Sequence, residues 1–354
     1  MKILLDGRFL SGKSNGISND AREIMKCLER EGHELYFLVY GDQNIPTLNG
    51  LVNSDRLIRA GSYRTELLKA IFRKRINLSR VHVDIYIQFQ ISPIRIKLPD
   101  ETRKIIRIHD LFPTTNPEWF PLRSRFLFRL GLTQLNHFDL LLANSKTTAR
   151  AFRNVLKSLK SQIEVLQCIV PVIEDVGLCG ICSFCIKPTE PWNAYFAVGT
   201  FEPRKNYSTL IEGFTEFNLE NRETLIIVGG QGWGHVPLPP SDHPSIHVYK
   251  DVCDATIGLL YKRAKAFISV SWQEGFNIPL YRAIKMKMKI IVSDIPIHRE
   301  VVGNYNVLWV NPEIATDLSS ALQYVDSYQL THCPQEDTRD FAEEIREVFF
   351  RFQG

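Results

Sequence analysis

Short runs of aliphatic and β-branched residues alternate along this chain with longer amphipathic segments. The short runs have the length of buried strands, and the longer segments repeat apolar residues at helical spacing. In the first half these segments are Ile3–Leu5, Ala21–Glu31, Leu35–Val39, Lys104–Ile108, Leu140–Ala143 and Lys146–Leu156. In the second half they are Tyr195–Val198, Tyr207–Asn218, Thr224–Val228, Ser245–Tyr249, Thr256–Lys262, Ala266–Val270, Pro279–Lys287 and Ile290–Val292. Strands that alternate with helices predict an α/β fold with two parallel, Rossmann-like sheets.

The region between the two series reads as a linker, because it carries Pro171, Gly177, Gly180, Pro188 and Pro191. The tail has apolar residues at helical spacing over Asp337–Phe352, so a C-terminal amphipathic helix is expected to pack back on the protein. Two facing α/β domains leave a cleft where ligands bind at strand carboxyl ends. The expected divisions are a first domain at 1–165, a linker at 166–192, a second domain at 193–325 and a helical tail at 326–354.

Charge is distributed unevenly between the halves. Residues 1–165 hold 27 Lys and Arg against 16 Asp and Glu, whereas the remainder holds 16 against 23. A basic first half suits a surface that meets phosphates, although a solvated surface without a partner is the plainer alternative. The start, MKILLDGRFL, lacks the features of a signal peptide, and no apolar run is long enough to span a bilayer. A cytoplasmic protein is therefore expected.

The seven cysteines are an odd number, which does not favour a disulfide framework. Cys179, Cys182 and Cys185, with Cys168 upstream, have the spacing of metal ligands and could hold zinc or an iron–sulfur cluster. The fourth cysteine of such a pattern is missing. Free thiols in a linker are therefore the favoured interpretation, and no metal is expected.

The segment Ser271–Ala283, SWQEGFNIPLYRA, follows an apolar strand. Pro279 suits the first turn of a helix, so the preceding loop should present backbone N–H groups at a helix N-terminus. A carboxylate there, Glu274, could accept hydrogen bonds from sugar hydroxyls and offset positive charge at an anomeric carbon. The alternative is that Glu274 only caps the helix.

A second segment, Val198–Asn206 or VGTFEPRKN, also follows a strand and precedes a helix. Arg204 and Lys205 could neutralise a diphosphate leaving group there without a metal ion. An exposed basic turn is the alternative.

Three weaker signals lie in the first half. His109 and Asp110 follow the strand in IIRIHDLFP, where a neutral histidine could contact a ligand. Gly16, in SNGIS, precedes a helix at a point where the backbone could approach a ligand closely. The segment Phe120–Leu132 mixes arginines with phenylalanines and could lie on an anionic membrane surface, or could be an ordinary half-buried helix.

Taken in order, these motifs resemble glycosyltransferase family 4, whose members are retaining enzymes of the GT-B fold that use nucleotide sugars without a bound metal. The resemblance runs from DGRFL and NGIS through IIRIHDLFP, LLANSKTTARAF, VGTFEPRKN, LIIVGGQGW and SWQEGFNIP to VSDIPIHREVVGN. It implies that Glu274 is the first glutamate of an E-x7-E motif and contacts the donor sugar. It further implies backbone contacts from Gly275, Phe276 and Asn277, phosphate binding by Arg204 and Lys205, a sugar-facing His109, and a Gly16 loop near the diphosphate.

The resemblance also implies a reaction. The sequence is similar to bacterial mannosyl- and rhamnosyltransferases of O-antigen or capsule assembly, so GDP-mannose is the best expectation for the donor. A polyprenyl-diphosphate-linked glycan is expected as the acceptor, with peripheral binding to the inner face of the plasma membrane and no nucleic-acid partner. The leaving phosphate would help to deprotonate the acceptor hydroxyl.

One residue departs from the family pattern. Arg282 stands where the second glutamate of the motif, the usual ribose ligand, is expected. An arginine can donate to ribose hydroxyls or to a phosphate, but it cannot accept as a carboxylate does. Two alternatives therefore stay open: a degenerate glycosyltransferase-like binding or scaffolding subunit, and a nucleotide-sugar epimerase or hydrolase of the same fold.

Overall fold

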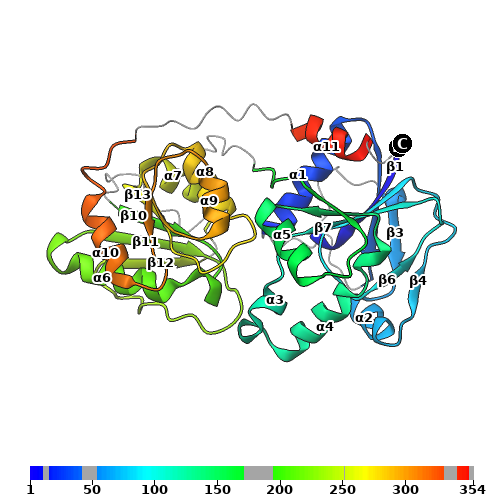
Figure 1. The fold of residues 1–354 in the computed structure, drawn as a ribbon, viewed down its shortest axis with the longest axis horizontal. Coiled ribbons are helices and arrows are strands. Elements are labelled where there is room, and N and C mark those ends of the chain that lie inside the picture. The colour runs from blue at the N-terminus through cyan, green and yellow to red at the C-terminus, as the bar shows by residue number, and fades with distance from the viewer. Residues whose placement is uncertain (11–15, 42–53, 171–193, 251, 331–340, 351–354) are drawn as a thin grey trace. The chain divides into compact units, whose positions relative to one another are not determined.

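The computed structural model describes residues 1–10, 16–41, 54–170, 194–250, 252–330 and 341–350, traced in Figure 1. The chain divides into two compact units. The first unit is Met1–Ile169 together with Thr338–Gly354, and the second is Val170–Asp337. The boundary between them falls inside the segment expected to be a linker, most of which lies outside the described residues.

The first unit is built on a parallel sheet with the strand order β3-β2-β1-β5-β7-β8-β9. Its strands are β1 (Lys2–Asp6), β2 (Glu34–Tyr40), β3 (Leu57–Ala60), β5 (Ile85–Gln88), β7 (Arg103–Ile108), β8 (Leu140–Ala143) and β9 (Gln162–Val165). Alternate residues of β1 enter different cores: Ile3 and Leu5 pack on one face and Leu4 on the other. A strand buried on both faces has to be apolar throughout, which explains its continuous aliphatic run.

Helices cover this sheet and connect its strands. They are α1 (Gly16–Arg30), α2 (Tyr63–Ile71), α3 (Phe112–Thr115), α4 (Leu122–Leu132), α5 (Lys146–Val155) and α11 (Phe341–Phe350), with the short 3-10 helices η1 (Gly7–Leu10), η2 (Ser54–Arg56), η3 (Pro117–Trp119) and η4 (Leu135–His137). A further two-stranded parallel sheet pairs β4 (Arg75–Asn77) with β6 (Arg95–Lys97).

The C-terminal helix α11 belongs to the first unit, as Figure 1 shows by its place against α1. Ile345 and Val348 enter the same core as Ile24 and Leu28 of α1. Arg346 forms an ion pair with Glu31, 2.8 Å between nitrogen and oxygen. The tail therefore returns to the N-terminal unit after the chain has formed the second unit.

The second unit is a six-stranded parallel sheet with the order β12-β11-β10-β13-β14-β15. The strands are β10 (Ala194–Val198), β11 (Thr224–Gly229), β12 (Ile246–Lys250), β13 (Ala266–Ser269), β14 (Ile290–Ser293) and β15 (Leu308–Val310). The helices are η5 (Pro203–Lys205), α6 (Tyr207–Asn221), α7 (Asp254–Arg263), α8 (Ile278–Lys285), α9 (Pro296–Val302) and α10 (Ala315–Tyr324).

Helices cover both faces of this second sheet. Phe214 of α6 and Leu318 of α10 pack in one core, and Leu260 of α7 and Leu280 of α8 pack in the other. The fold is therefore a doubly wound α/β sheet, as expected from the alternating pattern of strands and helices. Within the described residues, no helix is both long and apolar enough to cross a bilayer.

Candidate functional site

The second sheet reverses its strand order between β10 and β13. Strands β11 and β12 continue to one side of β10, while β14 and β15 continue to the other side of β13. In sheets of this kind ligands bind outside the carboxyl ends of the strands at this reversal. Arg204 and Lys205 follow β10 and Glu274 follows β13, so topology brings the two sequence motifs to the same point.

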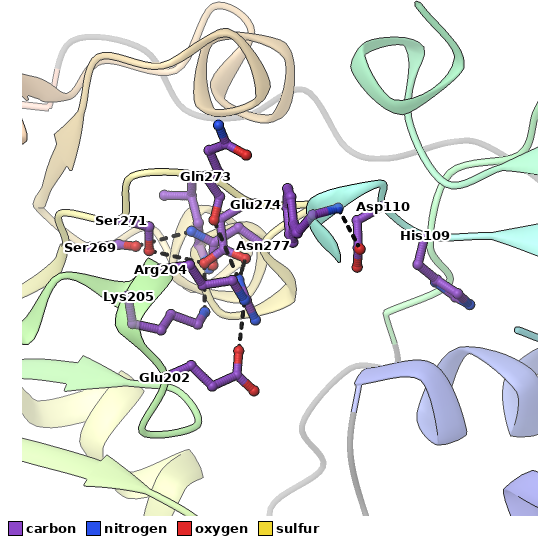
Figure 2. A network of polar contacts seen from close by, with 12 residues as sticks. His109, Asp110, Glu202, Arg204, Lys205, Ser269, Ser271, Gln273, Glu274 and Asn277 are labelled. Atoms are coloured by element: carbon purple, nitrogen blue, oxygen red, sulfur yellow. Dashed lines mark hydrogen bonds and ion pairs between the residues drawn. The ribbon is translucent and has the colours of Figure 1, made fainter. Parts of the chain in front are cut away.

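Glu274 lies at the centre of a buried polar cluster, shown in Figure 2. Its side chain is 4% exposed. Oε1 accepts from Lys205 Nζ at 2.6 Å and from the Ser271 hydroxyl at 2.9 Å. Oε2 accepts from Arg204 Nη1. The structure therefore brings these three charged side chains together.

A second carboxylate completes the charge balance. Glu202 Oε2 lies 2.7 Å from Arg204 Nε, and this glutamate is 4% exposed. The loops are also joined through the backbone, because Trp272 N donates to Arg204 O at 2.9 Å. Two acids and two bases can be buried together because each charge has an opposite partner and directed hydrogen bonds.

The cluster shifts the ionisation of its members. Burial opposes ionisation of Glu274, but the charges of Arg204 and Lys205 outweigh it and lower the pKa of the carboxyl to about 2. Burial lowers the pKa of Lys205, with Glu274 acting in the opposite direction. Burial raises the pKa of Glu202 despite the neighbouring Arg204. Glu274 is therefore the firmly ionised carboxylate of the pair.

Two residues beside the basic pair fix the turn. A Cβ on Gly199 would lie 3.0 Å from Cε of Lys205, so the glycine leaves room for the lysine to fold over the end of β10. Asn206 has φ 57° and ψ 45°, a left-handed conformation that asparagine tolerates better than most residues. Its Nδ2 donates to Val270 O at 3.0 Å and to Pro312 O at 2.7 Å. The sequence shows Asn206 only as the residue before a helix, and gives no sign of these distant partners.

The loop after Glu274 ends at Asn277, which caps α8. Asn277 has φ 71°, and its Oδ1 accepts from Leu280 N at 3.2 Å. Its Nδ2 donates to Ser269 Oγ at 3.0 Å and to His298 Nε2 at 2.8 Å. His298 is fully buried, and burial lowers its pKa to about 4, so the ring is neutral. The Asn277 side chain is thus committed within the protein, and the role of its backbone groups stays a prediction.

His298 also connects two strands of the site. Its Nδ1 lies 2.9 Å from Ser293 O, and Ser293 Oγ donates to Ser271 O at 2.7 Å. The histidine therefore links the helix cap to the segment that carries Glu274. The motif VSDIPIHREVVGN contains His298 but gives no sign of this role beyond a histidine near the start of a helix.

The remaining residues expected near the donor differ in their burial and in their contacts. Phe276 is buried, its ring centroid 5.7 Å from that of Tyr281, and Gly275 is partly exposed. Arg282 lies in the second turn of α8, and its Nε is buried without a hydrogen-bond partner among the described residues. In the part of the chain that the structure describes, no hydrogen bond or ion pair joins its side chain to the Glu274 cluster.

His109 lies in the first unit, at the carboxyl end of β7. Its Nε2 lies 3.0 Å from Phe89 O, a group that can only accept, so Nε2 carries the hydrogen. Burial lowers the pKa of His109 to about 4 against the opposing charge of Asp20. Within the described residues, Nδ1 has no protein partner and keeps a free lone pair. A neutral histidine in this tautomer can accept a hydrogen bond from a hydroxyl.

The first sheet also reverses its order, between β1 and β5. A cavity of about 150 Å³ lies there, lined by Asp6, Arg8, Phe9, Ile17, Ser18, Phe89 and Gln90. Gly16 is the first residue of α1, directly before two of these lining residues. Asp110, paired with His109 in the sequence motif, accepts from Phe112 N at 3.2 Å and so supports a local turn.

The cysteine motif falls largely outside the described residues, which do not include Cys179, Cys182 and Cys185. Cys168 is described and buried, with Sγ 3.9 Å from Arg107 Nη2. No group of three or more potential metal-binding side chains occurs in the described part of the chain.

Two protein-family models match this chain, one over most of each unit. Residues 14–172 match the model of Glycosyltransferase Family 4, and residues 187–348 match that of the Glycosyl transferases group 1. The chain belongs to these glycosyltransferases. Serotype-specific mannosyltransferase WbdA of Escherichia coli is 25% identical over 236 residues, which cover 61% of this chain and 29% of WbdA. O-antigen chain mannosyltransferase RfbU of Salmonella typhimurium is 25% identical over 65% of this chain and 62% of its own length. The chain thus matches under two thirds of either relative.

Solved structures agree on the fold. The lipopolysaccharide outer core galactosyltransferase WaaB has a TM-score of 0.63 at 14% identity, covering 99% of this chain and 100% of WaaB. An α,α-trehalose-phosphate synthase from Burkholderia xenovorans has a TM-score of 0.66 at 12% identity, covering 100% of both chains. With these neighbours, the two parallel-sheet units are those of the GT-B fold.

Proposed function

We propose that this protein is a retaining, metal-independent hexosyltransferase that moves mannose from GDP-mannose to a lipid-linked glycan of a surface polysaccharide. The observation that carries the proposal is the buried cluster of Glu274, Arg204 and Lys205 at the strand-order reversal of the second sheet. The mannosyltransferase names of WbdA and RfbU support mannose as the sugar.

The cluster suits departure of a diphosphate. Arg204 and Lys205 are held by Glu274 in the free protein, and an arriving diphosphate would compete for the same two cations. The Glu274 carboxylate would then turn part of its hydrogen-bonding capacity to hydroxyls of the sugar. Two protein cations at the leaving group take the part that a metal ion plays in other transferases, which supports metal independence.

In the proposed step the bond between the anomeric carbon and the diphosphate oxygen breaks. The acceptor oxygen bonds to the same face of that carbon, and its proton passes to an oxygen of the leaving diphosphate. The products are a glycoside of retained configuration and a nucleoside diphosphate. Glu274 offsets the positive charge that develops at the anomeric carbon.

The first unit is proposed to bind the acceptor. The cavity beside Asp6 and Arg8 contains charged and aromatic side chains, a combination that suits a sugar ring. Asp6 and Arg8 are fixed by a bidentate ion pair, with Nε to Oδ1 at 2.9 Å. We further propose that Nδ1 of His109 accepts a hydrogen bond from a sugar hydroxyl.

Helix α4 is the proposed site of peripheral membrane contact. Leu122 is 76% exposed and Phe126 is 55% exposed, and Arg123 and Arg129 are exposed on the same helix. Exposed apolar and basic side chains on one short helix favour contact with an anionic bilayer surface.

The test is incubation with a pool of GDP-, UDP- and dTDP-sugars and polyprenyl-diphosphate-linked glycans, followed by mass spectrometry of the product. The expected product gains one hexose, NMR shows retained anomeric configuration, and EDTA leaves the rate unchanged. Release of nucleotide without a glycosylated product would instead indicate a hydrolase.

A binding or scaffolding role is the second candidate, favoured by Arg282 in place of a ribose-binding carboxylate. Calorimetry with GDP-mannose distinguishes the two. Donor binding accompanied by turnover supports the enzyme, whereas sugar-nucleotide binding without turnover under any donor and acceptor combination supports the scaffold.

A further inference from the structure

A second cavity of the first unit contains none of the residues that the sequence motifs single out. It has a volume of about 90 Å³, several times the roughly 10–15 Å³ that holds one water molecule. Its lining comes from the two-stranded sheet, from β5 and β7 of the main sheet, and from the region of η4. The lining residues are Arg75, Tyr86, Gln88, Ile94, Arg95, Ile96, Leu98, Lys104, Gln134, His137 and Phe138.

The charged side chains of this cavity are all basic. Arg75 on β4, Arg95 on β6 and Lys104 on β7 lie around it, and His137 adds an imidazole. The strands β4 and β6 are labelled in Figure 1. No acidic side chain lines the cavity. Like charges gathered around one hollow repel each other unless an anion lies between them.

Among the described residues, the cations have no acidic partners that would explain their gathering. Arg95 Nε is buried without a hydrogen-bond partner, and within the described residues neither Arg75 nor the Lys104 ammonium forms an ion pair. Asp139, two residues after His137 in the sequence, does not line the cavity, and its carboxylate accepts from the Lys104 backbone N–H at 2.7 Å. A buried donor without a partner costs free energy, so a ligand that accepts from it binds favourably.

The neutral polar groups are committed elsewhere. Tyr86 is 2% exposed and donates to Gln88 Oε1 at 3.3 Å, while Gln88 Nε2 donates to Gln90 O at 2.8 Å. Gln134 Nε2 donates to Thr133 Oγ1 at 2.7 Å. The interior is thus fixed by hydrogen bonds, and the basic side chains carry the donors still available to a ligand.

We propose that this cavity is a binding site for a phosphoryl group, either of a free phosphate or diphosphate or of a phosphate-bearing lipid headgroup. Two guanidinium groups and an ammonium around one hollow match the tetrahedral oxygens and double charge of a phosphate, because arginine forks bind its oxygens in pairs. The inference does not depend on sugar transfer, and the cavity belongs to a different unit from the Arg204-Lys205 site.

His137 provides a local reporter. Burial, followed by the charges of Arg75, Arg95 and Lys104, lowers the pKa of its imidazole. A bound phosphate would offset these charges and raise the pKa of His137. Asp139, which accepts from the Lys104 backbone N–H, does not line the cavity.

The experiment follows the His137 ring resonances by NMR, assigned from their absence in His137→Asn, during titration with inorganic phosphate and then inorganic diphosphate. We expect saturable shifts and a raised pKa for His137. Arg95→Gln should weaken the binding reported by His137 roughly tenfold, as for loss of a charge-assisted hydrogen bond, and the added Lys104→Gln should weaken it further. The matched control is Arg150→Gln, which removes one exposed charge of α5 in the same unit.

A second arm separates the sources of the phosphoryl group. Phosphatidylcholine vesicles with and without phosphatidic acid are sedimented with the wild-type protein, Arg75→Gln and the control. If the wild type sediments only with vesicles that contain phosphatidic acid and Arg75→Gln does not, the ligand is a lipid headgroup. If the wild type binds diphosphate in the NMR titration but Arg75→Gln sediments as the wild type does, the ligand is a soluble phosphate. Arg75 is exposed, so this variant is informative even if Arg95→Gln fails to fold. Unchanged His137 resonances at saturating phosphate and diphosphate, or equal diphosphate affinity of Arg75→Gln and Arg150→Gln in the NMR titration, would overturn the proposal.

Discussion

Substitution of Glu274 by glutamine tests the centre of the site. The change keeps the shape of the side chain and removes its charge, while Arg204 and Lys205 remain buried around it. Because the carboxyl is 4% exposed, its interactions are weakly screened by solvent. The expected results concern both stability and transfer.

The magnitude for stability follows from the pKa. The Glu274 pKa falls from 4.5 to about 2, which corresponds to about 3 kcal/mol at roughly 1.4 kcal/mol per unit. This is comparable with the roughly 3–5 kcal/mol measured when one partner of a buried ion pair is removed. For a unit of this size, Glu274→Gln should lower Tm by roughly 6–12 °C at pH 7.

The sign of the pH dependence is fixed by the direction of the shift. A folded pKa below the unfolded value means that the unfolded chain binds the proton more readily. The contribution is therefore complete above about pH 4.5 and is lost as pH falls towards 2. Urea unfolding of the wild type and Glu274→Gln should differ most at pH 7, and the difference should shrink as the pH is lowered through this window.

Transfer should fall by roughly 10²–10³-fold, as for the loss of one group that stabilises developing charge. The rate is measured well below the Tm of the variant, so that unfolding does not contribute. The matched control is Glu216→Gln, an exposed glutamate of α6 in the same unit, which should match the wild type in both assays. Full transfer by Glu274→Gln, or a stability difference independent of pH, would refute the reasoning.

Four further predictions concern other residues. Lys205→Met should raise KM for the donor roughly tenfold or more through loss of a charge-assisted contact, measured by donor titration against Lys262→Met; an unchanged KM would remove Lys205 from the phosphate site. Arg282→Glu restores the carboxylate of the family motif and should tighten GDP-mannose binding in calorimetry, whereas weaker binding would mean that Arg282 itself contacts the donor. His109→Gln should lower kcat/KM roughly tenfold, since it alters one hydroxyl contact, and equal kinetics would argue against a substrate contact. Asp20→Asn should cost roughly 3–5 kcal/mol in urea unfolding because Arg107, whose Nε lies 2.7 Å from the Asp20 carboxylate, would stay buried without its counter-charge; a loss below 1 kcal/mol would contradict this.

The sequence predicted most of the strands that are buried on both faces. The runs at Ile3–Leu5, Lys104–Ile108 and Ala266–Val270 correspond to β1, β7 and β13 within a residue or two. Such strands must be continuously apolar, and that requirement makes their pattern visible. The second sheet, whose strands are mostly of this kind, was predicted more completely than the first.

The strands between residues 57 and 103 were not predicted. β3 and β6 have half-buried or exposed residues throughout, and β4 has a single half-buried residue between two exposed ones. β5 is fully buried, but Tyr86 and Gln88 interrupt its aliphatic residues, whereas the equally short β8 reads LLLA. The basic cavity draws on three of these four elements, so its arginines looked like isolated surface charges in the sequence.

In the candidate site, residues placed by the local sequence pattern were predicted, whereas residues that act through distant contacts were not. The local pattern of strand, loop and helix start predicted that Glu274 and the Arg204-Lys205 pair lie at the ends of strands. In the structure, the reversal of strand order brings those two strand ends together. His298 and Asn206 act over longer separations: His298 Nε2 lies 2.8 Å from Nδ2 of Asn277, 21 residues earlier, and Asn206 reaches Pro312. No spacing rule within one element could reveal either contact.

These distant contacts bear on how the site can work. Glu274 is separated from the helix cap at Asn277 by two residues, and the cap is held by a neutral, fully buried His298. Because the loop is held by groups that do not titrate near neutral pH, the position of Glu274 should survive the proposed exchange of Arg204 and Lys205 from its carboxylate to a diphosphate. The charges of the cluster can then rearrange around a ligand while the loop that carries Glu274 stays in place.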